Sequence, residues 1–266
     1  DHMSTKDIDP PVIERNITSR RARHIEKRDY VVRWLLEFQY STRSILCAAM
    51  QLTLTSQSKF FRSLKNSGLF VITRHPLLHE ELLLLSYSGK QYAAMIDPVR
   101  ADRYHATATR VMSSTTIHGL KVQAGVIARA DVSIPFSFQS ERLMEGIERS
   151  KRPDALIDLD GARVALEIEL TQKSTKRIYL GFLDHVENMK KSAYERVCYL
   201  FPSQALKSIY QERFDRPQWP VFYRDRYGKV RARMDGEASV MARADGGDVR
   251  QRYSFEVEEA ICDRQR

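Results

Sequence analysis

The sequence predicts an α+β protein in two parts: helices with a short β-hairpin first, then a mixed-sheet α/β core. Apolar residues recur at helical spacing within residues 28–97 and are followed by two short apolar runs. Residues 155–170 alternate around an Asp-Gly turn, as a β-hairpin does. Helical and strand patterns then alternate up to residue 214. The 266 residues, 42% of them hydrophobic, suffice to bury a core of this size.

Charge and cysteine content narrow the class of protein. The 43 Lys and Arg residues outnumber the 34 Asp and Glu residues, for a net charge of +9. This excess favours a polyanionic partner, nucleic acid first and an anionic membrane surface second, although a basic soluble protein is the plain alternative. No apolar run reaches the ~18 residues of a membrane span. Three scattered cysteines without a Cys-x-x-Cys pair predict neither a disulfide framework nor a zinc site, and favour a reducing cytoplasmic compartment.

Residues 1–27 are predicted to form a polar, basic arm. Its first residues, Asp1-His2-Met3, resemble a cloning scar at 1–2 before a natural start at Met3, and no signal peptide is expected. The arm contains Arg20, Arg21 and Arg23. They are either solvated or in contact with phosphates, and the two interpretations are compatible.

Residues 28–97 are predicted to contain three helices and then two strands. The first helix carries apolar residues from Tyr30 to Phe38, and the second begins at a cap formed by Ser41 or Thr42. The third runs from Ser56 to Lys65, with Thr55 as its cap, Phe60, Phe61 and Leu64 facing inward, and Gly68 just beyond its end. Strands are expected at Leu69–Thr73 and Leu82–Ser86, and a further helix from Ser88-Gly89.

This succession resembles a winged helix-turn-helix domain. The segment Leu84-Leu85-Ser86-Tyr87-Ser88-Gly89-Lys90 is similar to the Leu-Thr-x-x-Gly exit from the wing of such domains. The resemblance implies that the third helix enters the major groove of double-stranded DNA. Its outward side chains are predicted to contact bases and phosphates: Gln57, Ser58, Arg62 and Lys65. Protein contacts are the alternative use of such a domain.

The rest of the chain is divided into three parts. Residues 98–138 are predicted to be a helical linker, with a cap at Ser113-Ser114. Residues 139–235 form the second domain, which begins with a short helix containing Leu143, Met144 and Ile147. Its later elements are a helix from Ser174 to about Lys191, a strand at Arg196–Phe201, a helix at Ser203–Phe214 and a strand at Pro220–Tyr223. Residues 236–266 are left as a tail without a structural signal.

Two acidic residues on an apolar strand give the chemical signal. Along Ala162–Leu170, the aliphatic side chains share one face and Glu167 and Glu169 share the other. A solvent-facing strand would explain them, whereas carboxylates buried beside a core need a cation or a hydrogen-bond donor. Asp154 starts the neighbouring strand, so three carboxylates can meet. Such a set suits Mg²⁺ or Mn²⁺, which can polarise a phosphodiester, and Lys173 can add positive charge at the phosphate.

The order of elements around these residues resembles the PD-(D/E)XK nuclease superfamily over residues 139–215. A short helix and then Pro153-Asp154 precede the hairpin, and Glu167-Ile168-Glu169 ends it, before a long helix, a strand and a helix. The resemblance implies that Asp154 and Glu167 bind the metal. Glu169 stands where the family has lysine, so either Glu169 is itself a ligand or base, or Lys173 supplies the missing charge. Asp154, Glu167, Glu169 and Lys173 are thus the predicted catalytic residues.

A narrower resemblance covers residues 28–215. The segments His118-Gly119-Leu120-Lys121-Val122-Gln123, Arg152-Pro153-Asp154-Ala155 and Glu167–Ser174 are similar to mobilisation relaxases of the MOBC family and to replication-relaxation proteins. This implies one-strand nicking at a plasmid transfer origin, with an accessory mobilisation protein and a conjugation coupling protein as partners. The alternatives are a non-catalytic DNA-binding replication or transcription factor with a degenerate nuclease fold, and a restriction-type endonuclease. His118 itself is interpreted as a partly buried structural histidine.

Overall fold

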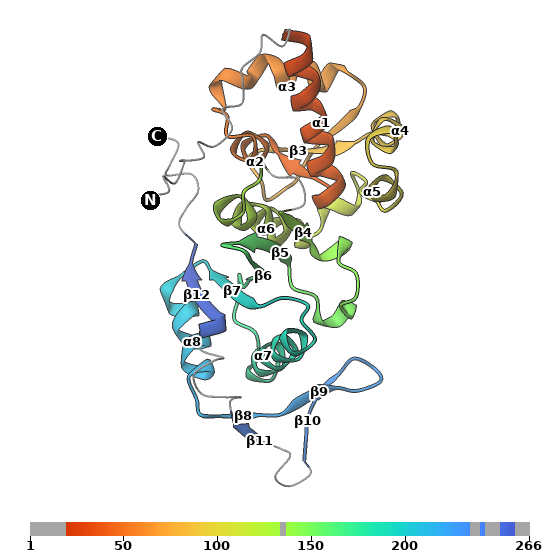
Figure 1. Ribbon diagram of the computed structural model, residues 1–266. Helices are drawn as coiled ribbons and strands as arrows, with labels where there is room; N and C mark the ends of the chain where they lie inside the picture. The colour runs from red at the N-terminus through yellow and green to blue at the C-terminus, as the bar shows by residue number, and fades with distance from the viewer. Residues whose placement is uncertain (1–19, 134–136, 235–239, 243–250, 259–266) are drawn as a thin grey trace, which may run out of the picture.

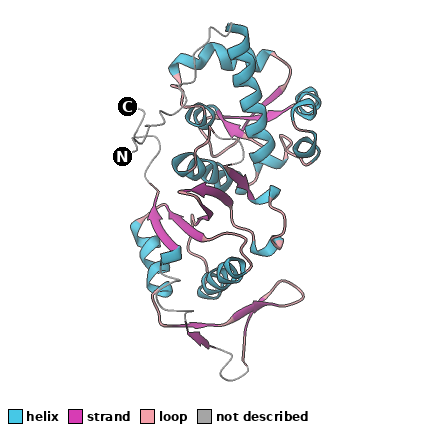
Figure 2. Ribbon diagram, viewed as in Figure 1, coloured by secondary structure: helices cyan, strands magenta, loops and turns pink. Residues whose placement is uncertain are grey.

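A computed structural model describes residues 20–133, 137–234, 240–242 and 251–258. Helices and strands alternate with each other, and the main sheet is mixed, so the predicted α+β class is confirmed (Figure 1). Figure 2 shows helices on both sides of the central strands. Within the described residues, no helix has the length and apolar content needed to cross a membrane.

The N-terminal unit combines helices with a small antiparallel sheet. Its elements are α1 (Arg20–Phe38), β1 (Ser41–Thr42), α2 (Arg43–Ala49), η1 (Thr55–Gln57), α3 (Ser58–Asn66), β2 (Phe70–Arg74), β3 (Glu81–Leu85), α4 (Tyr87–Ile96) and α5 (Pro98–Asp102). β3 pairs with both β1 and β2, which gives the order β1-β3-β2. Thr42 caps α2 as predicted, because its hydroxyl accepts a hydrogen bond from the Ile45 N–H.

The predicted basic arm is wrong for residues 20–27, because α1 already begins at Arg20. Contacts with α3 hold this polar turn in place: His24 lies 3.1 Å from the Ser63 hydroxyl and packs edge-on against the Phe60 ring. The charged, polar residues 20–27 show no helical pattern of apolar residues, and contacts with α3 stabilise the helix there. The scar predicted at residues 1–2 lies outside the described residues.

The third helix differs from the prediction only at its start. A 3₁₀ turn precedes α3, and Thr55 opens that turn without forming a side-chain cap. Phe60, Phe61 and Leu64 are buried as predicted. Gly68 follows the helix with a φ of +73°, a conformation that glycine adopts without steric cost.

The helix predicted as a linker is α6 (Thr115–Arg129), which follows the 3₁₀ turn η2 (Arg110–Met112). It does more than connect, because it lies between the N-terminal unit and the main sheet (Figure 1). Val126 of α6 belongs to one hydrophobic core with Val31 of α1 and Leu166 of the main sheet. The two parts of the chain therefore share buried surface.

The main sheet has the strand order β12-β7-β6-β5-β4. Its strands are β4 (Phe138–Ser140), β5 (Ala155–Leu159), β6 (Ala162–Ile168), β7 (Arg196–Phe201) and β12 (Tyr253–Val257). β4, β5 and β6 are antiparallel, whereas β6, β7 and β12 run parallel. The predicted hairpin turn is present, with Asp160 and Gly161 both at positive φ.

Two crossover helices complete the core. α7 (Thr175–Lys190) connects β6 to β7, and α8 (Gln204–Phe214) follows β7. They bury an aromatic cluster on the sheet face opposite α6, including Phe182, Tyr199 and Phe214. The predicted boundaries of these elements are confirmed to within a residue or two.

One expectation for this half is wrong, and the tail, for which no structure was predicted, contains a strand. In place of a short helix around Leu143, the chain forms the 3₁₀ turns η3 (Glu141–Leu143) and η4 (Arg149–Lys151), because Gly146 adopts a φ of +74° that interrupts any helix. The tail is partly structured, since β12 extends the main sheet. Tyr253 is buried there, and its hydroxyl donates a hydrogen bond to the Phe182 carbonyl at 3.1 Å.

Smaller strands lie beyond α8. β8 (Gln218–Pro220) pairs with β11 (Val240–Ala242), and β9 (Phe222–Arg224) pairs with β10 (Val230–Ala232). The β9–β10 hairpin packs against α7. Cys47 and Cys198 are buried free thiols, and Cys262 lies outside the described residues.

Candidate active site

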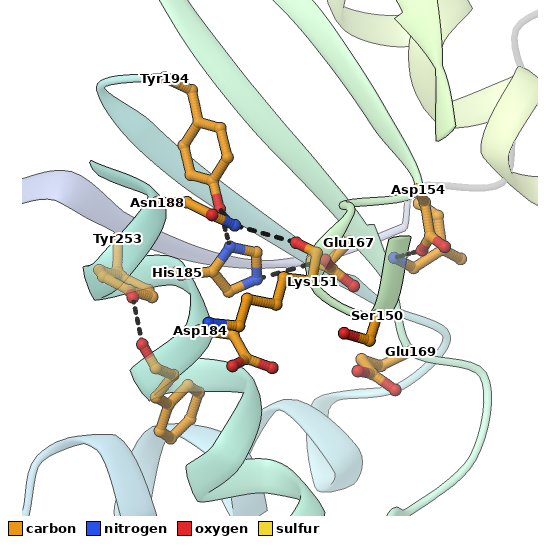
Figure 3. Close-up of polar contacts among 12 residues, drawn as sticks. Ser150, Lys151, Asp154, Glu167, Glu169, Asp184, His185, Asn188, Tyr194 and Tyr253 are labelled. Atoms are coloured by element: carbon orange, nitrogen blue, oxygen red, sulfur yellow. Dashed lines mark hydrogen bonds and ion pairs between the residues drawn. The ribbon is translucent and has the colours of Figure 1, made fainter. Parts of the chain in front are cut away.

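The predicted carboxylates gather where β5 begins and β6 ends (Figure 3). Ala155 pairs with Leu166, so Asp154 precedes this pair on one strand and Glu167 follows it on the other. The strand alternation is confirmed, because Leu166 faces the α6 core while Glu167 and Glu169 face α7. Antiparallel register thus brings together acids that are 13 and 15 positions apart in the sequence.

Asp154 is bound on two sides by the protein itself. Its Oδ2 accepts a hydrogen bond from the Ile168 N–H at 2.7 Å and lies 3.4 Å from Nε2 of His118. His118 Nε2 also lies 3.0 Å from the Ile168 carbonyl. The hydrogen bond to Asp154 raises the pKa of His118 to about 9. His118, interpreted from the sequence as structural, therefore contacts the candidate site.

Glu167 is the terminus of a directional hydrogen-bond chain from α7. Asn188 Nδ2 donates to the Lys151 carbonyl and to the Tyr194 hydroxyl, at 2.9 and 3.1 Å. The Tyr194 hydroxyl lies 2.7 Å from Nδ1 of His185, and Nε2 of the same ring lies 3.2 Å from Oε1 of Glu167. When the Tyr194 hydroxyl donates to Nδ1, the ring proton of a neutral His185 is on Nε2, toward Glu167.

Burial sets the protonation of this pair. Desolvation raises the pKa of Glu167 well above its ordinary value, and the negative charge of Asp154 raises it further. Desolvation also lowers the pKa of His185 to about 4, so the imidazole is neutral at physiological pH. A neutral His185 agrees with the single ring proton that the hydrogen-bond chain assigns.

Glu169 lies one step further along the same face and is paired with Lys173. Their Oε1 and Nζ atoms are 2.6 Å apart, and the carboxyl is buried while the ammonium is partly exposed. Burial raises the pKa of Glu169 to about 7 against the opposing effect of Lys173. The chain thus places a lysine ammonium beside the buried carboxyl of Glu169.

Glu167, Glu169 and Lys173 line one pocket of about 250 Å³ between the end of β6 and α7. Asp154 is not part of its lining. The lining also includes four further basic side chains and one more carboxylate: Lys151, Arg152, Arg177, Arg224 and Asp184. A cationic lining around a few carboxylates is complementary to a phosphate accompanied by a cation.

The described residues contain no group of three or more His, Cys, Asp or Glu side chains in a metal-binding arrangement. Asp154 and Glu167 are adjacent, while Glu169 is engaged by Lys173. The predicted three-carboxylate set is therefore brought to one region without meeting at one point.

The predicted DNA-contacting residues lie at the other end of the molecule, and they differ in whether they are exposed. Gln57 is wrong as an outward residue, because it is buried and accepts a hydrogen bond from Lys27 at 3.0 Å. Ser58, Arg62 and Lys65 are exposed on α3 and line a groove of about 480 Å³ that reaches β2 and β3. Arg21 and Arg23 are exposed on α1, and Arg20 is its first residue.

Two functional candidates escaped the sequence argument, His118 and His185. Each contacts its carboxylate only through the fold, since His118 comes from α6 and His185 from α7, on opposite faces of the sheet. No local pattern marks His185, and the segment that contains His118 indicates only the relaxase resemblance, with His118 interpreted as structural. Comparisons of the chain with protein-family models, with curated proteins and with solved structures found no match.

Proposed function

We propose that this protein is a divalent-metal-dependent DNA endonuclease with a nuclease core of the PD-(D/E)XK type. One observation carries the proposal. Three antiparallel strands are followed by a crossover helix and a parallel strand, and the acids Asp154 and Glu167 stand side by side where β5 begins and β6 ends. From the hairpin onward, this order of elements, with acids at that point, is what the resemblance of residues 139–215 implies, whereas β4 and two 3₁₀ turns stand in place of the expected first helix.

The N-terminal unit supports DNA as the substrate. A strand between the first two helices pairs with the second strand of the hairpin, in the order expected of a winged helix. α3 presents Arg62 and Lys65 to solvent beside that hairpin. Exposed basic side chains on such a helix suit a duplex entering the groove.

The donor set of the site fits a hard divalent cation. Asp154 and Glu167 would hold Mg²⁺ or Mn²⁺ through carboxylate oxygens, and Mg²⁺ often needs only one or two protein carboxylates beside substrate phosphates. The bound metal would supply charge neutralisation at the scissile phosphate and activation of the attacking water. Lys173, held by Glu169, would place its ammonium at the phosphate, and His185 would fix the orientation of the Glu167 carboxylate.

The target of cleavage follows from the narrower sequence resemblance. The proposal is a relaxase that nicks one strand at a plasmid transfer origin, with mobilisation and coupling proteins as partners. The segment carrying His118 supports this version, because His118 contacts Asp154 directly. A restriction-type endonuclease would share the chemistry and differ in its target.

A supercoiled-plasmid assay with Mg²⁺ or Mn²⁺ tests the proposal. Wild-type protein should convert a plasmid with a transfer origin to open circles and leave a plasmid without one intact. Asp154→Asn and Glu167→Gln should abolish nicking, while duplex binding through α3 persists. Linear product from both plasmids would indicate a general or restriction-type nuclease, and undiminished nicking by Asp154→Asn would contradict the site.

A non-catalytic DNA-binding factor is the second candidate function, and one observation favours it. Each carboxylate already has a basic partner within the chain, namely His118 for Asp154, His185 for Glu167 and Lys173 for Glu169. Calorimetric titration with Mn²⁺ separates the two functions. Heat with wild type and none with Glu167→Gln supports the enzyme, whereas a flat trace for both supports the factor.

A further inference from the structure

The β9–β10 hairpin is anchored at the mouth of the candidate active-site pocket. The Arg224 guanidinium donates to the Ser150 carbonyl and to Oδ2 of Asp184, at 3.1 and 3.2 Å, and it lines the pocket. Val230 pairs with Arg224 across the hairpin, so both lie on the face toward α7. In Figure 1 the hairpin lies beside α7 and extends away from the core of the molecule.

The outer face and the tip of this hairpin are strongly basic. Residues 222–233 contain five basic side chains and one acidic side chain: Arg224, Arg226, Lys229, Arg231, Arg233 and Asp225. Asp225 pairs with Arg231 at 3.1 Å and caps the turn through the N–H groups of Tyr227 and Lys229. The single acid is therefore used to build the turn, and Arg226 and Lys229 are exposed at its tip.

Two tyrosine rings are exposed among these charges. Tyr227 at the tip is 72% exposed, and Tyr223 on the outer face is 49% exposed. The Arg226 guanidinium lies 4.7 Å from the centroid of the Tyr227 ring, and Arg231 is directly opposite Tyr223. Alternating rings and cations form the surface on which unpaired bases stack while the phosphates are neutralised.

We propose that the β9–β10 hairpin binds a segment of single-stranded DNA and leads it to the pocket. Tyr223 and Tyr227 stack on its bases, and Arg226 and Lys229 contact its phosphates. A single strand fits better than a duplex because the bases of a duplex are already stacked on one another and leave no face for a tyrosine ring. That the ligand is DNA rests on the proposed function. The inference adds that the DNA reaching the pocket along the hairpin is single-stranded.

Fluorescence anisotropy with a labelled oligothymidylate of about 20 nucleotides tests the hairpin directly. The full-length protein is used in EDTA, so that binding is measured without cleavage. Tyr227→Ala and Tyr223→Ala should each weaken binding by about 5- to 160-fold, the range for loss of one base–aromatic stack. Tyr227→Phe keeps the ring and should bind like wild type. Tyr87→Ala, which removes an equally exposed tyrosine on α4, is the matched control.

The charges are tested through the salt dependence of the same binding. Each phosphate contact on a single strand contributes about 0.7 to the slope of log affinity against log salt. The double variant Arg226→Ala/Lys229→Ala should therefore lower the slope by about 1.4. A labelled duplex, which the N-terminal unit binds, should be held equally by wild type and by every hairpin variant.

The outcomes separate this inference from the proposed function. Unchanged oligothymidylate binding in both tyrosine variants, equal weakening by Tyr87→Ala, or no binding by wild type would each overturn it. Hairpin-dependent binding by a protein that never nicks plasmids would sustain it while the nuclease proposal fails. Circular dichroism melting of each variant confirms that lost binding does not reflect unfolding.

Discussion

At the scale of single residues, the three predicted carboxylates differ most in what compensates their charge. Asp154 has a backbone N–H and His118, Glu167 has a neutral imidazole, and Glu169 has an ammonium. At neutral pH the partners of Asp154 and Glu169 carry a positive charge, because the pKa of His118 is about 9, whereas the His185 partner of Glu167 is neutral. Glu167 is therefore the carboxylate that gains most from an added divalent cation.

We expect Tyr194→Phe to slow nicking by about 10-fold, the lower end of what loss of a partner behind a metal ligand costs. Without the hydroxyl, Nδ1 of His185 loses its donor, and the ring proton is no longer held on the nitrogen that faces Glu167. Nicking rates across a Mn²⁺ series would show the loss. Tyr179→Phe is the control, because that buried hydroxyl has no hydrogen-bond partner among the described residues. Equal slowing in both variants would contradict a positioning role for Tyr194.

The His118–Asp154 pair predicts a pH-dependent contribution to stability. The pKa of His118 is about 9 in the folded chain against an ordinary value of 6.5, so the folded state binds this proton more tightly. Its contribution is complete below pH 6.5 and is lost as pH rises through about 9. The difference in urea midpoint between wild type and His118→Gln, measured in EDTA, should shrink over this window. A difference that stays constant with pH, or one matched by His79→Gln at an exposed position, would argue against the pair.

At the scale of elements, Gly89 shows why the exit from β3 needs glycine. The Ser86 hydroxyl caps α4 by accepting from the Gly89 N–H at 3.0 Å. This draws the first turn of α4 onto the Leu69 carbonyl, and a Cβ on Gly89 would stand 2.0 Å from that oxygen. The Leu-x-x-x-Gly spacing in this segment thus reflects a close approach of two backbones.

Gly89→Ala should destabilise the chain by at least about 1 to 3 kcal/mol, because the backbone must move to relieve the overlap. Urea unfolding gives the measurement. Ser88→Ala changes the exposed neighbour and should stay within about 0.5 kcal/mol of wild type. Indistinguishable midpoints for Gly89→Ala and Ser88→Ala would show that the contact is not tight.

Elements defined by local chemistry were predictable from the sequence. The Asp160-Gly161 turn needs two residues tolerant of positive φ, and the alternation along β6 fixes which residues share a face. Glu167 and Glu169 were found through that alternation. The helices α7 and α8 begin one residue after Ser174 and Ser203, which hold their N-cap positions, and the Ser203 hydroxyl accepts a hydrogen bond from the Leu206 N–H.

Elements defined by distant contacts were not predictable. Leu143, Met144 and Ile147 have helical spacing and are buried, but they lie in turns. The positive φ of Gly146 prevents a continuous helix there. The start of α1 depends on α3, and β12 depends on an open edge of β7 and an aromatic cluster. His118 and His185 meet their carboxylates only after α6 and α7 have packed on opposite faces of the sheet.

At the scale of the whole molecule, the C-terminal strand should be essential to stability. Tyr253→Ala removes a buried ring from the aromatic cluster and should cost about 3 to 5 kcal/mol, as large-to-small core substitutions do. Chemical denaturation followed by tryptophan fluorescence is a direct measurement, since Trp219 belongs to the same cluster. Tyr227→Ala, at an exposed ring, is the control. If the denaturation midpoint of Tyr253→Ala were close to that of Tyr227→Ala, β12 would not contribute to the stability of the fold.

The shared core through α6 has a consequence for where the protein would cut. Val31, Val126 and Leu166 belong to one packed cluster, so α3 and the pocket are braced against each other without a flexible joint. A nuclease built in this way would hold its DNA-binding helix at a fixed distance from its active site. When α3 is bound to its recognition sequence, the pocket would reach a phosphate at one fixed position along the duplex. The nick should therefore fall at a constant number of base pairs from the gripped sequence, and bases inserted between the two would change which phosphate is cut while leaving that spacing unchanged.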